Sequence, residues 1–374
     1  MPNSISEWFG HRTYPSVTST AAAITDQHAE RCPFLGAVFS ADRKCIKAPN
    51  SRGVCTVSSE AEGRQMDWVV CPYRTLTSPI LEDSARRLFQ LKADKSPILV
   101  PAPALANAET QNRVRQAVQR RQPALVYFMD KLGGEIDLPG SRKSPKFKLD
   151  TTLVEMVPDE TGVGIGRHAI IEVQTMDYHG SYAAATESLS SALKLHPKEF
   201  AEQLRRNPNW ASVGIQSPNI ANVFKRTIYQ VLFKFQLGNH AACAGCILAI
   251  PRSVWLSWQP HLGAPDLKRL PDGSWQFADV EPHRDAQSAK GWILVFEVQQ
   301  DSKETPNPIC ITQAIRADSP TLARLAFEKA PTEAMNLLES GDVLRTVIRR
   351  RIAEFWPNLW PPATKPSKNS KRSR

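Results

Sequence analysis

The chain has 374 residues, 41% of them hydrophobic, and a net charge of +10. This length and composition are those of a folded chain with at least one large core, so they exclude global disorder. No apolar run approaches the ~18 residues of a membrane span, and the N-terminus lacks the basic and apolar segments of a signal peptide. We therefore expect a cytoplasmic protein.

The basic excess is unevenly distributed. The last 14 residues hold five basic residues and no acidic one, so about half of the excess lies in a tail at 361–374 that we expect to be disordered. A basic body with a basic tail suits a polyanion such as DNA, although such a tail can also serve solubility alone.

Four cysteines fall within one loop-rich stretch near the N-terminus: Cys32, Cys45, Cys55 and Cys71. Four thiolates where periodic apolar residues are scarce suit a tetrahedral Zn²⁺ or Fe site that stabilises the fold. Their spacings of 12, 9 and 15 residues lack a Cys-x-x-Cys pair, so scattered structural thiols remain an alternative. Cys243 and Cys246 do have that spacing, but they run into an apolar strand and are interpreted as buried small residues, and Cys310 as a lone core thiol.

Apolar periodicity predicts helices and strands in alternation along the rest of the chain. Helices are expected at 84–91, 107–121, 182–195, 198–206, 219–237, 323–329 and 334–351, and strands at 124–129, 147–150, 169–175, 246–250 and 293–298. This order predicts an α/β fold with a small mixed central sheet flanked by helices. We expect an N-terminal Cys₄ region at 1–76, a core at 77–360 and the tail.

Two of the helices carry rows of polar side chains on their outer faces. The helix at 107–121 bears Arg113, Arg115, Arg120 and Arg121, a cluster that either is solvated or contacts a nucleic-acid backbone. In the helix at 219–237, one row is expected to face solvent or phosphate, and it consists of Asn222, Arg226, Gln230 and Lys234.

Acidic side chains end two of the predicted strands. Glu172 and Gln174 lie two residues apart on one strand, so their side chains project from the same face about 6.5–7 Å apart. Asp150 closes the preceding strand, and Glu135 follows a Gly-Gly turn. Mg²⁺ is usually held by one or two carboxylates with waters and phosphate oxygens, so this pattern indicates metal-assisted phosphodiester cleavage. The alternative is an ordinary polar strand end at a sheet edge.

The sequence resembles the NotI-type restriction endonucleases, which have a PD-(D/E)xK-like nuclease core. The resemblance covers most of the chain, and its most specific stretch is Gln-Thr-Met-Asp-Tyr-His-Gly-Ser-Tyr at 174–182. The other residues that carry it are 8–15, 32–35, 51–55, 67–72, 131–135, 172–173, 218–219 and 222–227.

The resemblance implies a type II enzyme that cuts double-stranded DNA as a homodimer at a palindromic, GC-rich site, alongside a cognate DNA methyltransferase. It places Asp150 and Glu172 as ligands of catalytic Mg²⁺, with Gln174 where the usual motif has Lys and Glu135 as a further active-site acid. It also makes Cys32, Cys45, Cys55 and Cys71 a structural Fe site, or a Zn site if loaded differently.

Three other interpretations are weighed against this one. The first is a metal-stabilised DNA-binding protein that does not cut, which the presence of Asp150, Glu172, Gln174 and Glu135 together disfavours. The second is a repair or RNA nuclease of the same fold. The third assigns His179 as a general base, but local packing suits its position beyond the strand end better.

Overall fold

The computed structural model describes residues 3–39, 42–61, 63–76, 79–92, 94–160, 162–278, 289–339, 343–357 and 359. The tail at 361–374 lies outside these residues, so the expectation that it is disordered concerns a segment that the structure does not describe.

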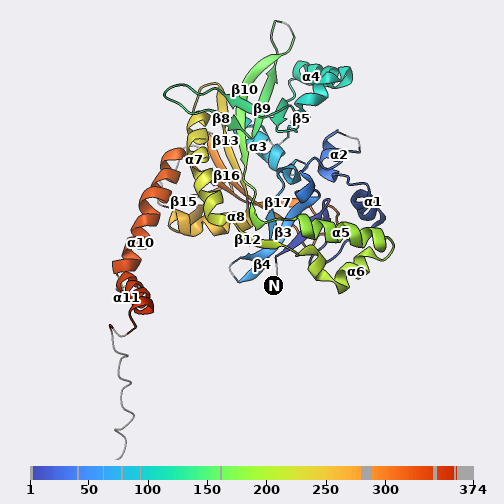
Figure 1. Ribbon diagram of the computed structural model, residues 1–374. Helices are drawn as coiled ribbons and strands as arrows, with labels where there is room; N and C mark the ends of the chain where they lie inside the picture. The colour runs from blue at the N-terminus through green and yellow to red at the C-terminus, as the bar shows by residue number, and fades with distance from the viewer. Residues whose placement is uncertain are drawn as a thin grey trace, which may run out of the picture.

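A nine-stranded mixed sheet forms the centre of the molecule (Figure 1). In spatial order its strands are β14 (Leu267–Arg269), β15 (Trp275–Phe277), β17 (Ile309–Arg316), β16 (Gly291–Val298), β13 (Cys243–Pro251), β10 (Gly164–Val173), β9 (Thr151–Val157), β6 (Ala124–Met129) and β5 (Ile98–Pro101). The α/β class with a mixed sheet between helices is confirmed. The sheet is larger than predicted, because β5, β9, β14, β15 and β17 were not expected as strands.

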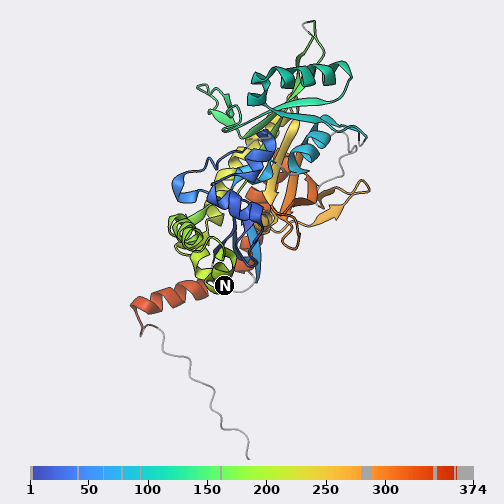
Figure 2. The same cartoon turned by 90° about the vertical axis from the view of Figure 1, so that its right-hand side faces the viewer.

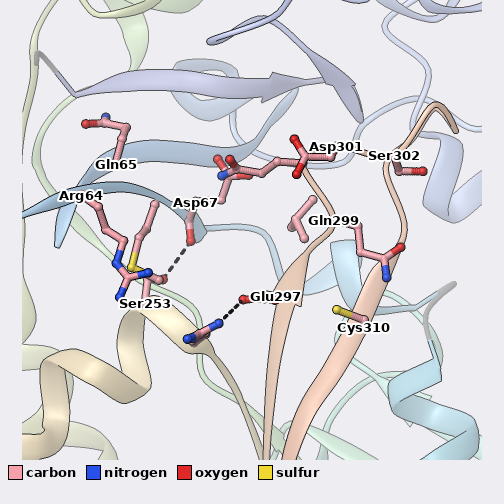
Figure 3. A pocket seen from close by; sticks show the side chains of 13 residues that line it. Arg64, Gln65, Asp67, Ser253, Glu297, Gln299, Asp301, Ser302 and Cys310 are labelled. Carbon is pink, nitrogen blue, oxygen red and sulfur yellow. Dashed lines mark hydrogen bonds and ion pairs between the residues drawn. The ribbon is translucent and has the colours of Figure 1, made fainter. Parts of the chain in front are cut away.

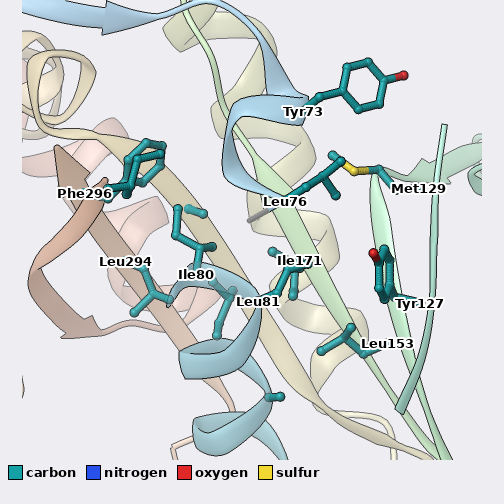
Figure 4. Close-up of a cluster of buried hydrophobic side chains, with 14 of the residues drawn as sticks. Tyr73, Leu76, Ile80, Leu81, Tyr127, Met129, Leu153, Ile171, Leu294 and Phe296 are labelled. Atoms are coloured by element: carbon teal, nitrogen blue, oxygen red, sulfur yellow. The ribbon is translucent and has the colours of Figure 1, made fainter. Parts of the chain in front are cut away.

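The faces of the sheet are covered by different helices. On one face Ile171 of β10 and Ile247 of β13 pack with α3 (Pro79–Phe89), in the apolar cluster drawn in Figure 4. On the other face Ile170 and Leu248 pack with α7 (Ile220–Gly238). Because side chains alternate along a strand, even-numbered residues of β10 point towards α7.

Further helices and short strands surround this core. Helix α4 (Ala108–Gln119) covers the β5 edge, and Asn107 caps it, since its side chain accepts hydrogen bonds from the backbone N–H groups of Glu109 and Thr110. Other helices are α5 (Ala183–Leu195), α6 (Phe200–Arg206) and α8 (Arg252–Trp258). Two small sheets pair β7 (Ile136–Leu138) with β8 (Phe147–Leu149), and β11 (Tyr178–Gly180) with β12 (Ile215–Pro218). Short 3₁₀ segments are η1 (Pro49–Ser51), η2 (Pro72–Thr75), η3 (Ala102–Ala106), η4 (Pro208–Ala211) and η5 (Gln259–Leu262).

The N-terminal region contains a four-stranded antiparallel sheet, where the sequence predicted loops. Its strands, in spatial order, are β2 (His11–Arg12), β1 (Ser4–Trp8), β3 (Val54–Ala61) and β4 (Arg64–Val69). Helices α1 (Ala21–His28) and α2 (Pro33–Phe39) complete the region. A buried ion pair joins Glu7 of β1 to Arg74 of η2. The Arg74 guanidinium also donates a hydrogen bond to the backbone oxygen of Asn307, before β17.

The C-terminal helices extend outwards from the body (Figures 1 and 2). Helix α9 (Ser319–Arg324) continues through a π-helical turn (Leu325–Lys329) into α10 (Ala330–Glu339), and α11 (Val343–Phe355) follows. The helix predicted over 334–351 falls on α10 and α11, and residues 340–342 between them lie outside the described part of the chain.

Candidate functional site

Glu172 is a buried carboxylate on the α7 face of the central sheet. It lies near the end of β10, with Leu248 of β13 beside it, and only 4% of the residue is exposed. Its Oε1 accepts a hydrogen bond from the backbone N–H of Asp150 at 3.3 Å. The strand alternation that buries Ile170 against α7 therefore also directs this carboxylate to α7.

Asp150 faces Glu172 because of the register between two neighbouring strands. Thr151 of β9 pairs with Ile171 of β10, so continuing the register by one residue sets Asp150 opposite Glu172. In contrast to Glu172, the Asp150 side chain is 41% exposed. The sequence predicted that Asp150 ends a central strand at 147–150, but β8 pairs with β7 outside the central sheet and Asp150 directly precedes β9. The two carboxylates nevertheless meet, as expected.

Lys234 of α7 places an ammonium group against both carboxylates. Its Nζ lies 2.5 Å from Oε2 of Glu172 and 3.7 Å from Oδ1 of Asp150. The residue is 1% exposed, so the expectation that it faces solvent or phosphate is wrong. The other members of its predicted row, Asn222, Arg226 and Gln230, are exposed as expected.

Lys234 differs from its row because it also belongs to the buried stripe of α7. Thr227 and Val231, seven and three residues before Lys234, and Gly238, four residues after it, are buried on the same side of the helix. The sequence does contain a signal for this position. A single lysine stands within Val231-Leu232-Phe233-Lys234-Phe235, where a solvated charge is out of place.

The electrostatics of the cluster favour a cation. Burial raises the pKa of Glu172 well above its ordinary value, the charge of Asp150 raises it further, and Lys234 opposes both effects. Two carboxylates and one ammonium group leave one uncompensated negative charge when all are ionised. A divalent cation held by Asp150 and Glu172 fits this donor set, since Mg²⁺ takes oxygen ligands and carboxylates above all.

Gln174 projects from the same face of the strand as Glu172, but its amide is engaged elsewhere. Its oxygen accepts a hydrogen bond from Thr227 of α7, and its nitrogen donates to the backbone oxygen of Thr175. Gln174 thereby ties the end of β10 to α7. The positive charge beside the carboxylates comes from the helix, at Lys234.

A cleft of about 650 Å³ gives access to Asp150. Glu135 lies in it, 3.3 Å from the Lys148 Nζ, and the pairing of Ile136 with Leu149 sets Glu135 next to Asp150 at the end of the β7–β8 hairpin. The lining of the cleft includes Phe147, which stacks on Phe233 of α7 with ring centroids 3.9 Å apart. The rim is basic and polar, and it includes Lys146, Lys148, Lys225, Arg226, Tyr229 and Gln230.

The four N-terminal cysteines lie in one neighbourhood. Cys32, Cys55 and Cys71 are buried within the same apolar cluster as α3, and Cys45 packs against it. Burial raises the pKa of the Cys32 thiol to about 12, and the neighbouring Cys71 and Cys45 raise it too. Within the described ranges, no group of three or more His, Cys, Asp or Glu side chains is arranged so that it could hold a metal ion.

The other three cysteines lie elsewhere in the structure. Cys243 and Cys246 are buried on β13, in agreement with their interpretation as buried small residues. Cys310 is only partly buried, so its interpretation as a core thiol is wrong.

A second cavity, of about 580 Å³, opens beside β4, α8 and the β16–β17 connection (Figure 3). Two of its acids are already neutralised by arginines. The Asp67 Oδ2 lies 2.5 Å from Arg12, and the Glu297 Oε2 lies 3.0 Å from Arg252. The Asp150–Glu172 pair differs from these acids, because one ammonium group faces two carboxylates there.

Two other groups from the sequence analysis lie away from the cleft. His179 is exposed on β11, and the arginine cluster at 113–121 lies on or just after α4, at the opposite edge of the central sheet from β14. The cleft itself is formed by α7 and the β7–β8 hairpin.

A search against models of known protein families gives no match to this chain, and a search of curated proteins gives none either. Among the helices of the described residues, none combines the length and the apolar character needed to span a bilayer.

Proposed function

We propose that this protein is a Mg²⁺-dependent endonuclease of double-stranded DNA, of the type II restriction class that its sequence resembles. The observation that carries the proposal is the cluster of Asp150, Glu172 and Lys234 beside a cleft with a basic rim. Two carboxylates with an adjacent ammonium group form a donor set for metal-assisted phosphodiester hydrolysis.

In this proposal Asp150 and Glu172 hold the Mg²⁺. When bound there, the ion supplies Lewis-acid polarisation of the phosphoryl oxygen and lowers the pKa of a bound water. Lys234 lowers the pKa of Glu172 against the opposing effects of burial and Asp150, and orients the carboxylate through the 2.5 Å contact. It also provides positive charge near the reacting phosphate, the role that a Gln at position 174 cannot fill.

The rim of the cleft has the charge to hold a phosphate backbone. Lys146, Lys148 and Arg226 each have a side chain about 60% exposed, and Lys225 is exposed beside them. Cationic side chains of this kind position a duplex without reading its sequence. Glu135, next to Asp150, is a further acid within reach of the same site.

The proposal includes a structural role for the four N-terminal cysteines. Three buried thiols and one partly buried thiol from separate parts of the region lie in the same apolar neighbourhood, although the described side chains do not form a metal-binding arrangement as they stand. Such a donor set suits Fe or Zn, which take tetrahedral thiolate sites. The chain is further proposed to act as a homodimer at a palindromic, GC-rich site, with a cognate DNA methyltransferase as its functional partner in the host.

The direct test is to incubate the purified protein with a large GC-rich plasmid or phage DNA, with Mg²⁺ or with EDTA. We expect discrete fragments with Mg²⁺ only, and no fragments with Asp150→Asn or Glu172→Gln. Glu109→Gln on α4, outside the cleft, serves as the matched control and should cut normally. A salt-sensitive gel shift without cleavage, on DNA that contains every short palindrome, would instead favour the DNA-binding alternative.

A further inference from the structure

The C-terminal helices form an arm with an apolar surface that the described part of the chain does not cover. Helix α11 has 13 residues, and none of them is buried. Nine large apolar side chains of the arm are more than one third exposed, and they are Phe327, Met335, Leu337, Val343, Leu344, Val347, Ile348, Ile352 and Phe355. Figures 1 and 2 show this arm leaving the body.

The apolar residues of α11 form one continuous stripe. Leu344, Ile348, Ile352 and Phe355 follow each other at spacings of four, four and three residues, so they share one side of the helix. Val347 extends this stripe. Thr346, by contrast, points to the opposite side.

The stripe carries little net charge despite the arginines in α11. Arg351 is the charged residue nearest its middle, and its Nη1 lies 2.6 Å from the Glu354 Oε2 in the same helix. Arg345, seven residues before Ile352, lies on the other flank of the stripe, and Arg349 lies further round the helix. Two such stripes can therefore pack together through their apolar centres, with these arginines at the flanks.

The described part of the chain buries none of the side chains of α11. Isolated helices shorter than about 12–15 residues are marginal in water, because most helical stability in proteins comes from packing an apolar face. Large exposed apolar patches also mark interaction sites.

We propose that this arm is the dimerisation surface of the protein and that its occupant is the arm of a second copy of the same chain. The inference rests on the proposed function, since cutting both strands of a palindrome requires two active sites related by a two-fold axis. In an isologous contact, the same surface of both subunits forms the interface. An apolar stripe that can pack against a second copy of itself suits such a contact.

The exposed apolar area of the arm is substantial. Nine apolar side chains are between 39% and 84% exposed, and five of them lie on the α11 stripe. Standard interfaces bury about 800 Å² per partner, and the arm supplies a large part of such an area.

Sedimentation velocity of the full chain, without DNA and without Mg²⁺, tests this inference. We expect the unaltered protein to be a dimer at micromolar concentration and Ile348→Glu to raise the dissociation constant at least about 100-fold. Thr346→Glu, on the opposite side of the same helix, should leave the dimer intact. Circular dichroism should show a folded body for both variants, because α11 contributes no buried side chain to it.

The inference would be overturned if the unaltered protein were a monomer at all concentrations. The stripe would then have to be covered by another part of the chain or by DNA. Persistence of the dimer in Ile348→Glu would also overturn the inference. Failure of the proposed function can be distinguished from failure of the dimer inference, because Asp150→Asn should lose cleavage and remain a dimer. If both inferences hold, Ile348→Glu should nick circular DNA more often than it linearises it.

Discussion

Replacing Lys234 by Met should destabilise the protein strongly, and in a way that depends on pH. Lys234 and Glu172 are 1% and 4% exposed, so the substitution leaves a carboxylate uncompensated in the core. Removing one partner of a buried ion pair costs about 3–5 kcal/mol. Asp150 is far less affected, because its side chain is 41% exposed and water solvates it.

Protonation of Glu172 sets a ceiling on this cost. Without Lys234, the pKa of Glu172 in the folded state rises further above its unfolded value near 4.5. A raised carboxyl pKa removes stability as the pH increases from the unfolded value towards the folded one. About pH 8 is roughly 3.5 pH units above the unfolded pKa of Glu172, so protonating this carboxylate there costs about 5 kcal/mol. At about pH 5.5 the same protonation costs only about 1.4 kcal/mol.

Urea denaturation at these two pH values measures the effect. We expect Lys234→Met to lose about 3–5 kcal/mol at about pH 8 and under ~1.5 kcal/mol at about pH 5.5. Adding Glu172→Gln should restore most of the loss and remove its pH dependence. Lys146→Met is the matched control, since its partner Asp137 is exposed and such pairs contribute about 0–1 kcal/mol. An equal loss at both pH values, or no recovery in the double variant, would refute this electrostatic account.

Three other predictions concern the metal sites and the DNA contacts. Mg²⁺ affinity should fall as the pH drops through the raised pKa of Glu172, because the ion needs the ionised carboxylate. Calorimetric titration at about pH 6 and about pH 8 measures this affinity, and equal values would contradict the prediction. Replacing Lys225 and Arg226 by Ala should reduce the salt dependence of DNA binding by about 1.8 in the log–log slope, if each contacts one phosphate. An unchanged slope would exclude these two side chains from the interface. Cys55→Ser should lower both metal content and melting temperature, and a stable variant that has merely lost cleavage would speak against a structural metal site.

Local sequence patterns were sufficient for many elements of the fold. The strand at 124–129 has the bounds predicted for it, and the helix at 219–237 is one residue displaced at each end. Asn107 caps α4, and an Asn directly before a helical segment is a local signal for a helix start. These features depend on residues within one or two turns of each other, which a single sequence contains directly.

The N-terminal strands were missed because polar residues are buried in them among the apolar ones. In β1 and β3 the residues Ser6 and Thr56 are buried, and their hydroxyl groups hydrogen-bond to each other at 2.8 Å. Glu7 is fully buried against Arg74, 67 residues away. Without apolar alternation such segments look like loops, and their partners are distant in the sequence.

The sequence by itself determined which residue types stand at the strand ends, and this was sufficient to identify Asp150 and Glu172 as a pair. Only the tertiary structure decided that Lys234 completes the cluster and that Gln174 bonds to Thr227. The physical reason is that strand register and the rotation of α7 on the sheet are set by packing over long sequence distances. Periodicity describes the faces of one element, whereas the site arises where the faces of three elements meet.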